Sequence, residues 1–173
     1  MGFNTAKRRT WAQSIIEDND EKKGTLAVQS IRNCLMASTL TATIAAILNS
    51  SLAALTNNTY NAAEILKNSF FGSQSDPVLT LKYCSASVFL LTSFLCSTMA
   101  VGFLNEANFL MNVSEFSPGY VHDMLERGFL FAFIGHRMLY VTFTLLLWMF
   151  GPIPMALSSM AMVWVLYGLD FII

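Results

Sequence analysis

Two long stretches without a charged side chain constrain this protein more than any other feature. Residues 33–63 and 83–105 contain no Asp, Glu, Lys, Arg or His. A helix needs about 20 apolar residues to cross the ~30 Å hydrocarbon core of a bilayer. Both stretches are long enough, and the second is too long and too uniformly apolar for an amphipathic helix that lies on a membrane surface. The pattern therefore predicts an integral membrane protein built from helices.

The overall composition supports this class and excludes others. Of the 173 residues, 54% are hydrophobic and 12% are charged, whereas an ordinary soluble domain has roughly 25% charged residues. A soluble fold of this size would lack the polar groups to cover its surface. The formal net charge is −1, and no basic patch lies beyond the N-terminus, so nucleic acid is excluded as a partner.

The first two spans lie at about residues 34–55 and 83–104. A third apolar run, at about 129–150, is followed by Gly151-Pro152-Ile153-Pro154, where the prolines break the helix. Apolar sequence then resumes over about 155–173. One helix over both runs would be more than twice as long as the bilayer is thick, so we expect two antiparallel spans. The predicted fold class is all-α, a polytopic membrane bundle of four transmembrane helices.

The distribution of Lys and Arg predicts the orientation. Eight of these residues fall on the side of the N-terminus and two on the other side. The positive-inside rule then places both termini in the cytosol, with residues 56–82 as an outer loop and 105–128 as a cytosolic loop. Residues 1–33 form a charged, amphipathic cytosolic segment, in which Gly24-Thr25 predicts the end of one helix and the cap of the next. The membrane is either the plasma membrane or an endomembrane.

A polar layer is predicted near the cytosolic face. Counting helical rises from the outer ends of the last two spans puts Arg137 and Asp170 at nearly the same depth. Opposite charges at one depth on neighbouring antiparallel helices should pair, because an unpaired charge is costly there. Polar residues of the other spans fall at the same face. The candidate layer comprises Arg32, Asn105, Glu106, Asn108, His136, Arg137 and Asp170.

This layer has two interpretations. It is either an interhelical hydrogen-bonded clamp with snorkelling side chains, or a cytosolic vestibule that binds an ion, an anion or a lipid headgroup. His136 can carry or sense protons, although a histidine that is merely hydrogen-bonded is the simpler interpretation. No catalytic residue, cofactor site or metal site is expected. The three cysteines lack metal-ligand spacing, and the common catalytic and nucleotide-binding motifs are absent from the sequence.

These features favour a regulatory or accessory membrane protein that works without catalysis. The alternative is a small-solute or ion transporter or channel component that uses Arg137, Asp170 and Glu106 of the polar layer. An enzyme acting on membrane lipid is disfavoured, because the sequence shows no base–nucleophile pair. The expected partners are the lipid bilayer and either a second copy of the chain or another membrane protein. Small residues of the first two spans would supply that contact.

Several short stretches, taken together, resemble a known family. They are Arg8-Arg9-Thr10-Trp11, Ile31-Arg32-Asn33-Cys34, Phe103-Leu104-Asn105-Glu106-Ala107-Asn108, Glu126-Arg127-Gly128-Phe129, Trp148-Met149-Phe150-Gly151-Pro152 and Leu166-Tyr167-Gly168-Leu169-Asp170-Phe171. Their order and spacing resemble the plant multi-pass membrane family known as domain of unknown function 599, over nearly the whole chain. The resemblance implies a plant membrane protein with no assigned reaction. Family members usually have a further apolar segment before the Arg-Arg-x-Trp stretch, so the resemblance also implies that this chain lacks the family's first transmembrane segment.

Overall fold

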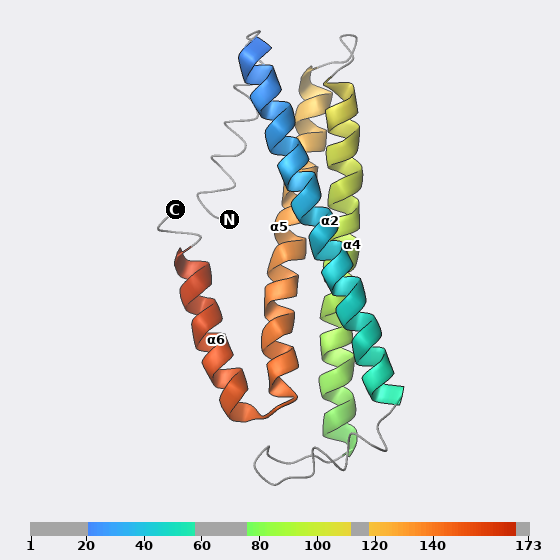
Figure 1. Cartoon of the computed structure of the whole chain (residues 1–173), viewed down its shortest axis with the longest axis vertical. Helices are drawn as coiled ribbons and strands as arrows, with labels where there is room; N and C mark the ends of the chain where they lie inside the picture. Colours follow the sequence, from blue (N-terminus) through green and yellow to red (C-terminus); the bar gives the residue numbers. More distant parts are fainter. Residues whose placement is uncertain (1–20, 58–75, 112–117, 169–173) are drawn as a thin grey trace. The chain divides into compact units, whose positions relative to one another are not determined.

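Four helices make up nearly all of the part of the chain that the computed structural model describes, which is residues 21–57, 76–111 and 118–168. They are α2 (Glu21–Asn57), α4 (Asp76–Leu110), α5 (Pro118–Trp148) and α6 (Pro152–Tyr167) (Figure 1). The described part is all-α, which confirms the predicted class.

Three of these helices are long and apolar enough to cross a membrane. The qualifying segments are Gly24–Thr56 of α2, Thr80–Leu110 of α4 and Gly119–Trp148 of α5. The fourth helix, α6, is apolar but has only 16 described residues. The described helices therefore indicate a membrane protein with three candidate spans and one shorter apolar helix.

The helices differ from the prediction at several of their ends. Gly24 lies inside α2 and does not end a helix there. A glycine C-cap needs a positive φ, which Gly24 does not have. Residues 105–110 and 118–128, which lie within the predicted cytosolic connection 105–128, are helical. The remainder of the predicted N-terminal segment, residues 1–20, lies outside the described residues.

Prolines mark the helix starts. All four prolines of the sequence lie in the first turn of a helix: Pro77 in α4, Pro118 in α5, and Pro152 and Pro154 in α6. The first N–H groups of a helix have no partner within the helix, so a proline costs no hydrogen bond there. The same reasoning, applied to Pro77 and Pro118, locates the starts of α4 and α5 from the sequence.

The described helices contribute to two compact units, each with its own core. Unit 1 comprises Met1–Ala42 and Leu95–His136, and unit 2 comprises Thr43–Phe94 and Arg137–Ile173. The buried hydrophobic core of unit 1 contains Ile31, Leu104, Ala107, Leu110, Val121 and Leu125. That of unit 2 contains Ala45, Leu52, Tyr83, Ala86, Leu90, Leu139 and Met149.

A seven-residue spacing relates the buried positions along each long helix. The buried residues at this spacing are Ile31, Ser38, Ala45 and Leu52 in α2; Tyr83, Leu90, Ser97 and Leu104, with Ala86, Ser93, Ala100 and Ala107, in α4; and Val121, Gly128, Gly135 and Thr142 in α5, followed by Met149 just after its end. This is the heptad spacing by which packed helices keep one face toward each other. We call these positions the seam.

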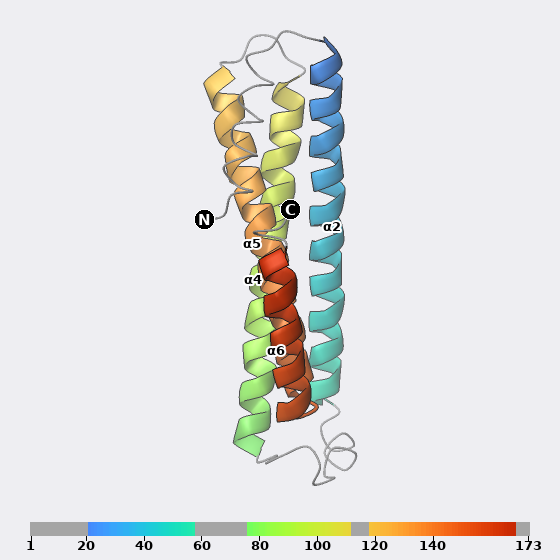
Figure 2. The ribbon, with the colours of Figure 1, turned by 90° about the vertical axis from the view of Figure 1, so that its left-hand side faces the viewer.

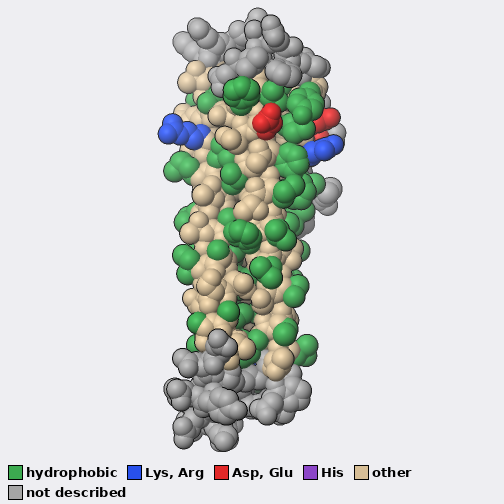
Figure 3. Space-filling model, turned by 90° about the vertical axis from the view of Figure 1, so that its right-hand side faces the viewer, with side chains coloured by type: hydrophobic (Ala, Val, Ile, Leu, Met, Phe, Trp, Pro, Cys, Tyr) green, Lys and Arg blue, Asp and Glu red, His purple; other side chains and the backbone are tan. Residues whose placement is uncertain are grey.

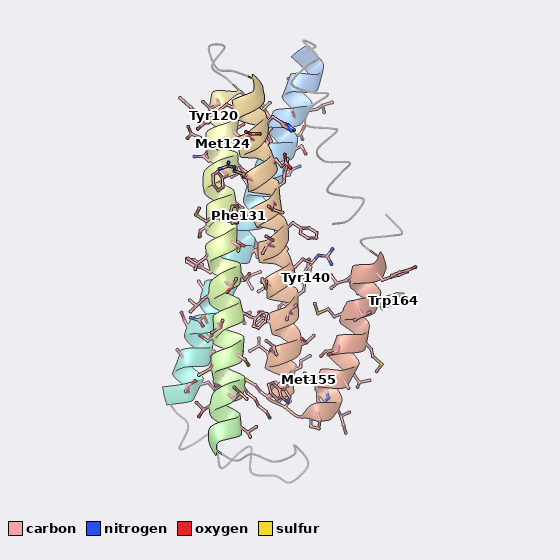
Figure 4. All side chains as sticks on the ribbon, turned by 180° about the vertical axis from the view of Figure 1, so that it is seen from behind. Tyr120, Met124, Phe131, Tyr140, Met155 and Trp164 are labelled. Atoms are coloured by element: carbon pink, nitrogen blue, oxygen red, sulfur yellow. The ribbon has the colours of Figure 1, made fainter. Side chains whose placement is uncertain are left out.

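Small residues let the helix backbones approach closely at the seam. At Gly128 of α5, the Cβ of an alanine would lie 2.8 Å from both Cγ and Cδ2 of Leu104 and 3.3 Å from its backbone nitrogen. Next to this contact, the rings of Phe103 and Phe131 stack with their centroids 5.6 Å apart (Phe131 is labelled in Figure 4). Unit 1 is therefore tightly packed where α5 meets α4.

The exterior suits a hydrocarbon environment. On the face drawn in Figure 3, charged side chains gather in one zone, and hydrophobic and neutral side chains cover the rest. Exposed hydroxyl groups donate hydrogen bonds to backbone carbonyls one turn earlier in their own helix. The pairs are Thr39 with Leu35, Ser51 with Ile47 and Thr92 with Val88. These groups need no water, so they can face lipid.

A tight turn joins α5 to α6. Three short-range backbone hydrogen bonds end α5, the last from the N–H of Gly151 to the carbonyl of Trp148 (3.2 Å). Gly151 then adopts a φ of 140°, a conformation that glycine takes readily because it has no Cβ. As a result α6 runs antiparallel to α5 within unit 2 (Figure 2).

Gly128→Ala should destabilise the protein by about 1–3 kcal/mol, because the added methyl group overpacks the contact with Leu104. The measurement is the unfolding free energy of purified protein in detergent. Gly102→Ala is the matched control, since nothing lies within 4 Å of its Cβ position, and it should keep or slightly raise stability. Equal stability of the two variants would contradict the tight seam.

Candidate polar site

The structure places the members of the predicted polar layer in different surroundings. Arg32 of α2 and both Asn105 and Glu106 of α4 are exposed, and within the described residues no hydrogen bond or ion pair is recorded for these three side chains. Asn108 of α4 and Arg137 of α5 are half-buried. Asp170, and with it the predicted pair with Arg137, lies outside the described residues.

His136 of the predicted layer makes a defined contact between helices. Its Nε2 lies 3.0 Å from Oγ1 of Thr41 on α2. Its Nδ1 lies 2.7 Å from the carbonyl oxygen of Ala132, one turn earlier on α5. Both ring nitrogens of this half-buried histidine therefore have partners, and all three residues belong to unit 1.

The number of hydrogen atoms available at this contact links the acceptor that Thr41 uses to the number of protons on the His136 ring. The carbonyl of Ala132 can only accept, so Nδ1 must carry a hydrogen. The hydroxyl of Thr41 also lies 2.9 Å from the carbonyl of Ala37 and has one hydrogen to give. When it donates to Ala37, Nε2 must donate to Thr41 and the ring is an imidazolium. When the ring is neutral, Thr41 donates to Nε2 instead.

Two further hydroxyl groups lie in the seam of unit 1. Ser38 of α2 and Ser97 of α4 are fully buried, and neither Oγ has a hydrogen-bond partner within the described structure. Figure 1 shows that α2 and α4 are antiparallel. Ile31 and Leu104 share one core, and a step of seven residues from each, forward on α2 and back on α4, leads to Ser38 and Ser97. The two serines therefore lie at one level of the helix pair.

Sequence reasoning missed Thr41, Ser38 and Ser97. The prediction relied on ionisable residues at matching depths, whereas Thr41 and Ser38 are neutral residues of a span rich in Ala, Ser and Thr, and Ser97 is a neutral residue of the second span. The heptad spacing was the available signal, because it separates inward hydroxyls from those that face lipid.

Unit 2 has a polar contact of its own. Oγ of Ser87 on α4 donates to Oδ1 of Asn49 on α2, at 2.8 Å. Interhelical hydrogen bonds of this kind contribute on the order of 1 kcal/mol in a membrane protein. In the described part of the chain, no group of three or more His, Cys, Asp and Glu side chains is arranged to hold a metal ion. The arrangement supports hydrogen bonding between helices at His136 and at Asn49.

A double-mutant cycle with Thr41→Val and His136→Phe should give a coupling energy of about 0.5–1.5 kcal/mol, because the two side chains share one interhelical hydrogen bond. The measurement is again the unfolding free energy in detergent. Ser51→Ala on the same helix, combined with His136→Phe, is the control and should show no coupling, since Ser51 bonds to its own backbone. Strictly additive effects for Thr41 and His136 would contradict the contact.

Comparison with known proteins places this arrangement in a family. The family model described as protein of unknown function, DUF599, matches residues 1–173. No curated protein and no solved structure matches the chain. Because the family match covers the whole chain, it confirms the family expected from the sequence: this protein belongs to the DUF599 family.

Proposed function

We propose that this chain is a regulatory or accessory membrane protein that works without catalysis, spans the membrane four times and has both termini in the cytosol. The observation that carries the accessory role is the surface of α6. None of its residues is buried. In contrast, α2, α4 and α5 bury a seam along their whole described length.

Exposed hydrophobic side chains surround α6. They are Ile153, Leu157, Met160, Val163, Trp164, Val165 and Tyr167. A helix that is hydrophobic all round belongs in lipid or against another apolar helix. Trp164 is 78% exposed, and it is labelled in Figure 4. Exposed aromatic residues of this kind are enriched where proteins bind one another, so we infer that α6 contacts the helices of a membrane partner.

The turn at Gly151 supports four crossings. It sends α6 back along α5, and apolar sequence continues beyond α6 to Ile173. The described α6 alone is ~24 Å long at 1.5 Å per residue, which is somewhat short of the hydrocarbon core. The residues that follow it would complete the crossing.

A transport component is the second candidate function, and the polar side chains between the helices of unit 1 favour it. Polar groups within a membrane bundle often mark the path of an ion or a proton. Here the His136–Thr41 contact and the buried hydroxyls of Ser38 and Ser97 provide such groups. In this interpretation Arg137, Asp170 and Glu106 would form the cytosolic entrance. Solute or proton flux in proteoliposomes, lost in His136→Phe, would favour this function over the accessory one.

The topology is tested with single cysteines in a background where Cys34, Cys84 and Cys96 are replaced by alanine. Asp20→Cys and Ile173→Cys should react with a membrane-impermeant maleimide only from the cytosolic side, and Gln74→Cys only from the opposite side. Labelling of Ile173→Cys on the same side as Gln74→Cys would show that α6 does not complete a crossing. That result would overturn the four-span proposal.

The accessory role is tested with a photoreactive amino acid in native membranes. Placed at Trp164 on α6, it should cross-link the chain to a membrane protein of defined mass. Leu95 on α4 is the control, because it is similarly exposed (60%) but belongs to a helix with its own seam. Cross-links to lipid alone at Trp164, or the same products at both positions, would contradict a partner site on α6.

A further inference from the structure

Three exposed charges lie on three helices of unit 1: Arg32 of α2, Glu106 of α4 and Arg127 of α5. Within the described residues, no ion pair is recorded for any of them. Glu106 lies four residues before the end of the candidate span of α4, and Figure 3 shows charged side chains gathered in one zone. Because water is scarce at the edge of the hydrocarbon core, charges there gain from a partner of opposite sign.

The contacts between the helices place these three charges at one level. Leu104 of α4 shares a core with Ile31 of α2 and lies against Gly128 of α5, so these three residues mark a common level. Each of the charged residues is one or two positions away from that level along its helix, a rise of at most about 3 Å.

The two arginines differ in the carboxylates that their own helices offer. Arg127 has Asp123 four residues earlier on α5, a spacing at which opposite charges pair along a helix. Arg32 has no acidic residue within four positions on α2. Arg32 and Glu106 are therefore the cation and the anion of this level for which a partner outside the chain matters most.

The exposed side of α4 beside Glu106 has room for another helix. Gly102, one turn before Glu106, is exposed, and nothing lies within 4 Å of its Cβ position. Thr98, one turn earlier again, is also exposed. Small residues four positions apart let two membrane helices approach closely, because no bulky side chain separates their backbones. We call Thr98, Gly102, Asn105 and Glu106 the outer face of α4.

The charges identify a second copy of the chain as the occupant of this face. Two copies inserted in the same direction are related by a two-fold axis along the membrane normal, so equivalent residues lie at the same depth. Arg32 of the second copy is therefore available at the level of Glu106, and the same contact forms a second time in reverse. This reciprocal match distinguishes a second copy from an unrelated apolar helix.

We propose that the chain forms a two-fold symmetric dimer in the membrane through the outer face of α4. The two α4 helices cross near Gly102, and Glu106 of each copy pairs with Arg32 of the other. Close packing at Gly102 supplies the affinity, and the two ion pairs fix the register, since charged pairs contribute more to specificity than to affinity. The dimer rests only on the membrane location in the proposed function and is independent of α6 and its partner.

The test measures fluorescence energy transfer between full chains in phosphatidylcholine liposomes over a range of lipid-to-protein ratios. The dyes are attached to Asp20→Cys in the background without the native cysteines. Glu106→Arg and Arg32→Glu should each weaken self-association by on the order of tenfold, because each brings like charges together at both contacts. With the donor on one variant and the acceptor on the other, association should return to the wild-type level, because opposite charges then meet at both contacts.

Two further variants complete the experiment. Arg127→Glu is the matched control, because it reverses an exposed charge at the same level. It should self-associate as the wild type does, and it should not restore association when mixed with Glu106→Arg. Gly102→Ala should not lower the stability of the single chain, since the methyl group meets nothing there, but it should weaken the dimer at least about fivefold by separating the two backbones.

Three results would overturn the proposal. Energy transfer no greater than that of randomly distributed monomers would show that the chain does not self-associate. Undiminished association in both Glu106→Arg and Gly102→Ala would place the contact on another face. Weakened association that mixing does not restore would show that Glu106 and Arg32 do not pair between copies. If Glu106→Arg fails to fold, Glu106→Gln replaces it, and equal association of Glu106→Gln, Gly102→Ala and the wild type counts against the dimer.

Discussion

The close approach of helix backbones is the constraint on which the rest of this structure depends. In a bilayer, backbone hydrogen bonds must be satisfied within the helices, and lipid tails are as apolar as leucine side chains. Burial of apolar surface therefore cannot hold such helices together, and close packing must do so. The seam supplies that packing with Gly, Ala and Ser at seven-residue spacing, most tightly at Gly128 against Leu104.

The same constraint determines where polar groups can lie. Hydroxyl groups on the exterior donate to the carbonyl of the preceding turn, so that they present no unpaired hydrogen to lipid. Polar groups on inner faces bond across helices, as His136 does with Thr41 and Asn49 with Ser87. Buried polar atoms without a hydrogen-bond partner in the described structure include the hydroxyls of Tyr83, Ser38 and Ser97 and Nδ1 of His122. A bound water or a ligand usually satisfies such atoms.

The fold class was predictable from the sequence, because long charge-free stretches admit few alternatives to membrane helices. The family was also predictable, from motifs spread over the chain. The ends of the helices were harder to predict from the sequence. The predicted ends follow the apolar stretches, whereas α2 and α4 extend beyond those stretches. Gly24, which was predicted to end a helix, lies within α2. The proline positions contained the missing information for α4 and α5.

The candidate site was predicted only in part. His136 is a member of the predicted layer, and it contacts Thr41, which the prediction did not include. Depth along a helix can be counted from the sequence, whereas the direction in which a side chain points requires the heptad register. Arg32, Asn105 and Glu106 have the expected kind of side chain but are exposed. Lys82 had been assigned to a loop, and its burial against Trp148 depends on how α4 packs on α5.

The single hydrogen of the Thr41 hydroxyl has a mechanical consequence. A threonine that bonds to the carbonyl four residues earlier tends to bend its helix. Thr41 has a single hydrogen, and both the carbonyl of Ala37 and the ring of His136 lie within its reach. The same hydroxyl therefore takes part both in the bending of α2 and in its attachment to α5, so a substitution of His136 on one helix would alter the curvature of another.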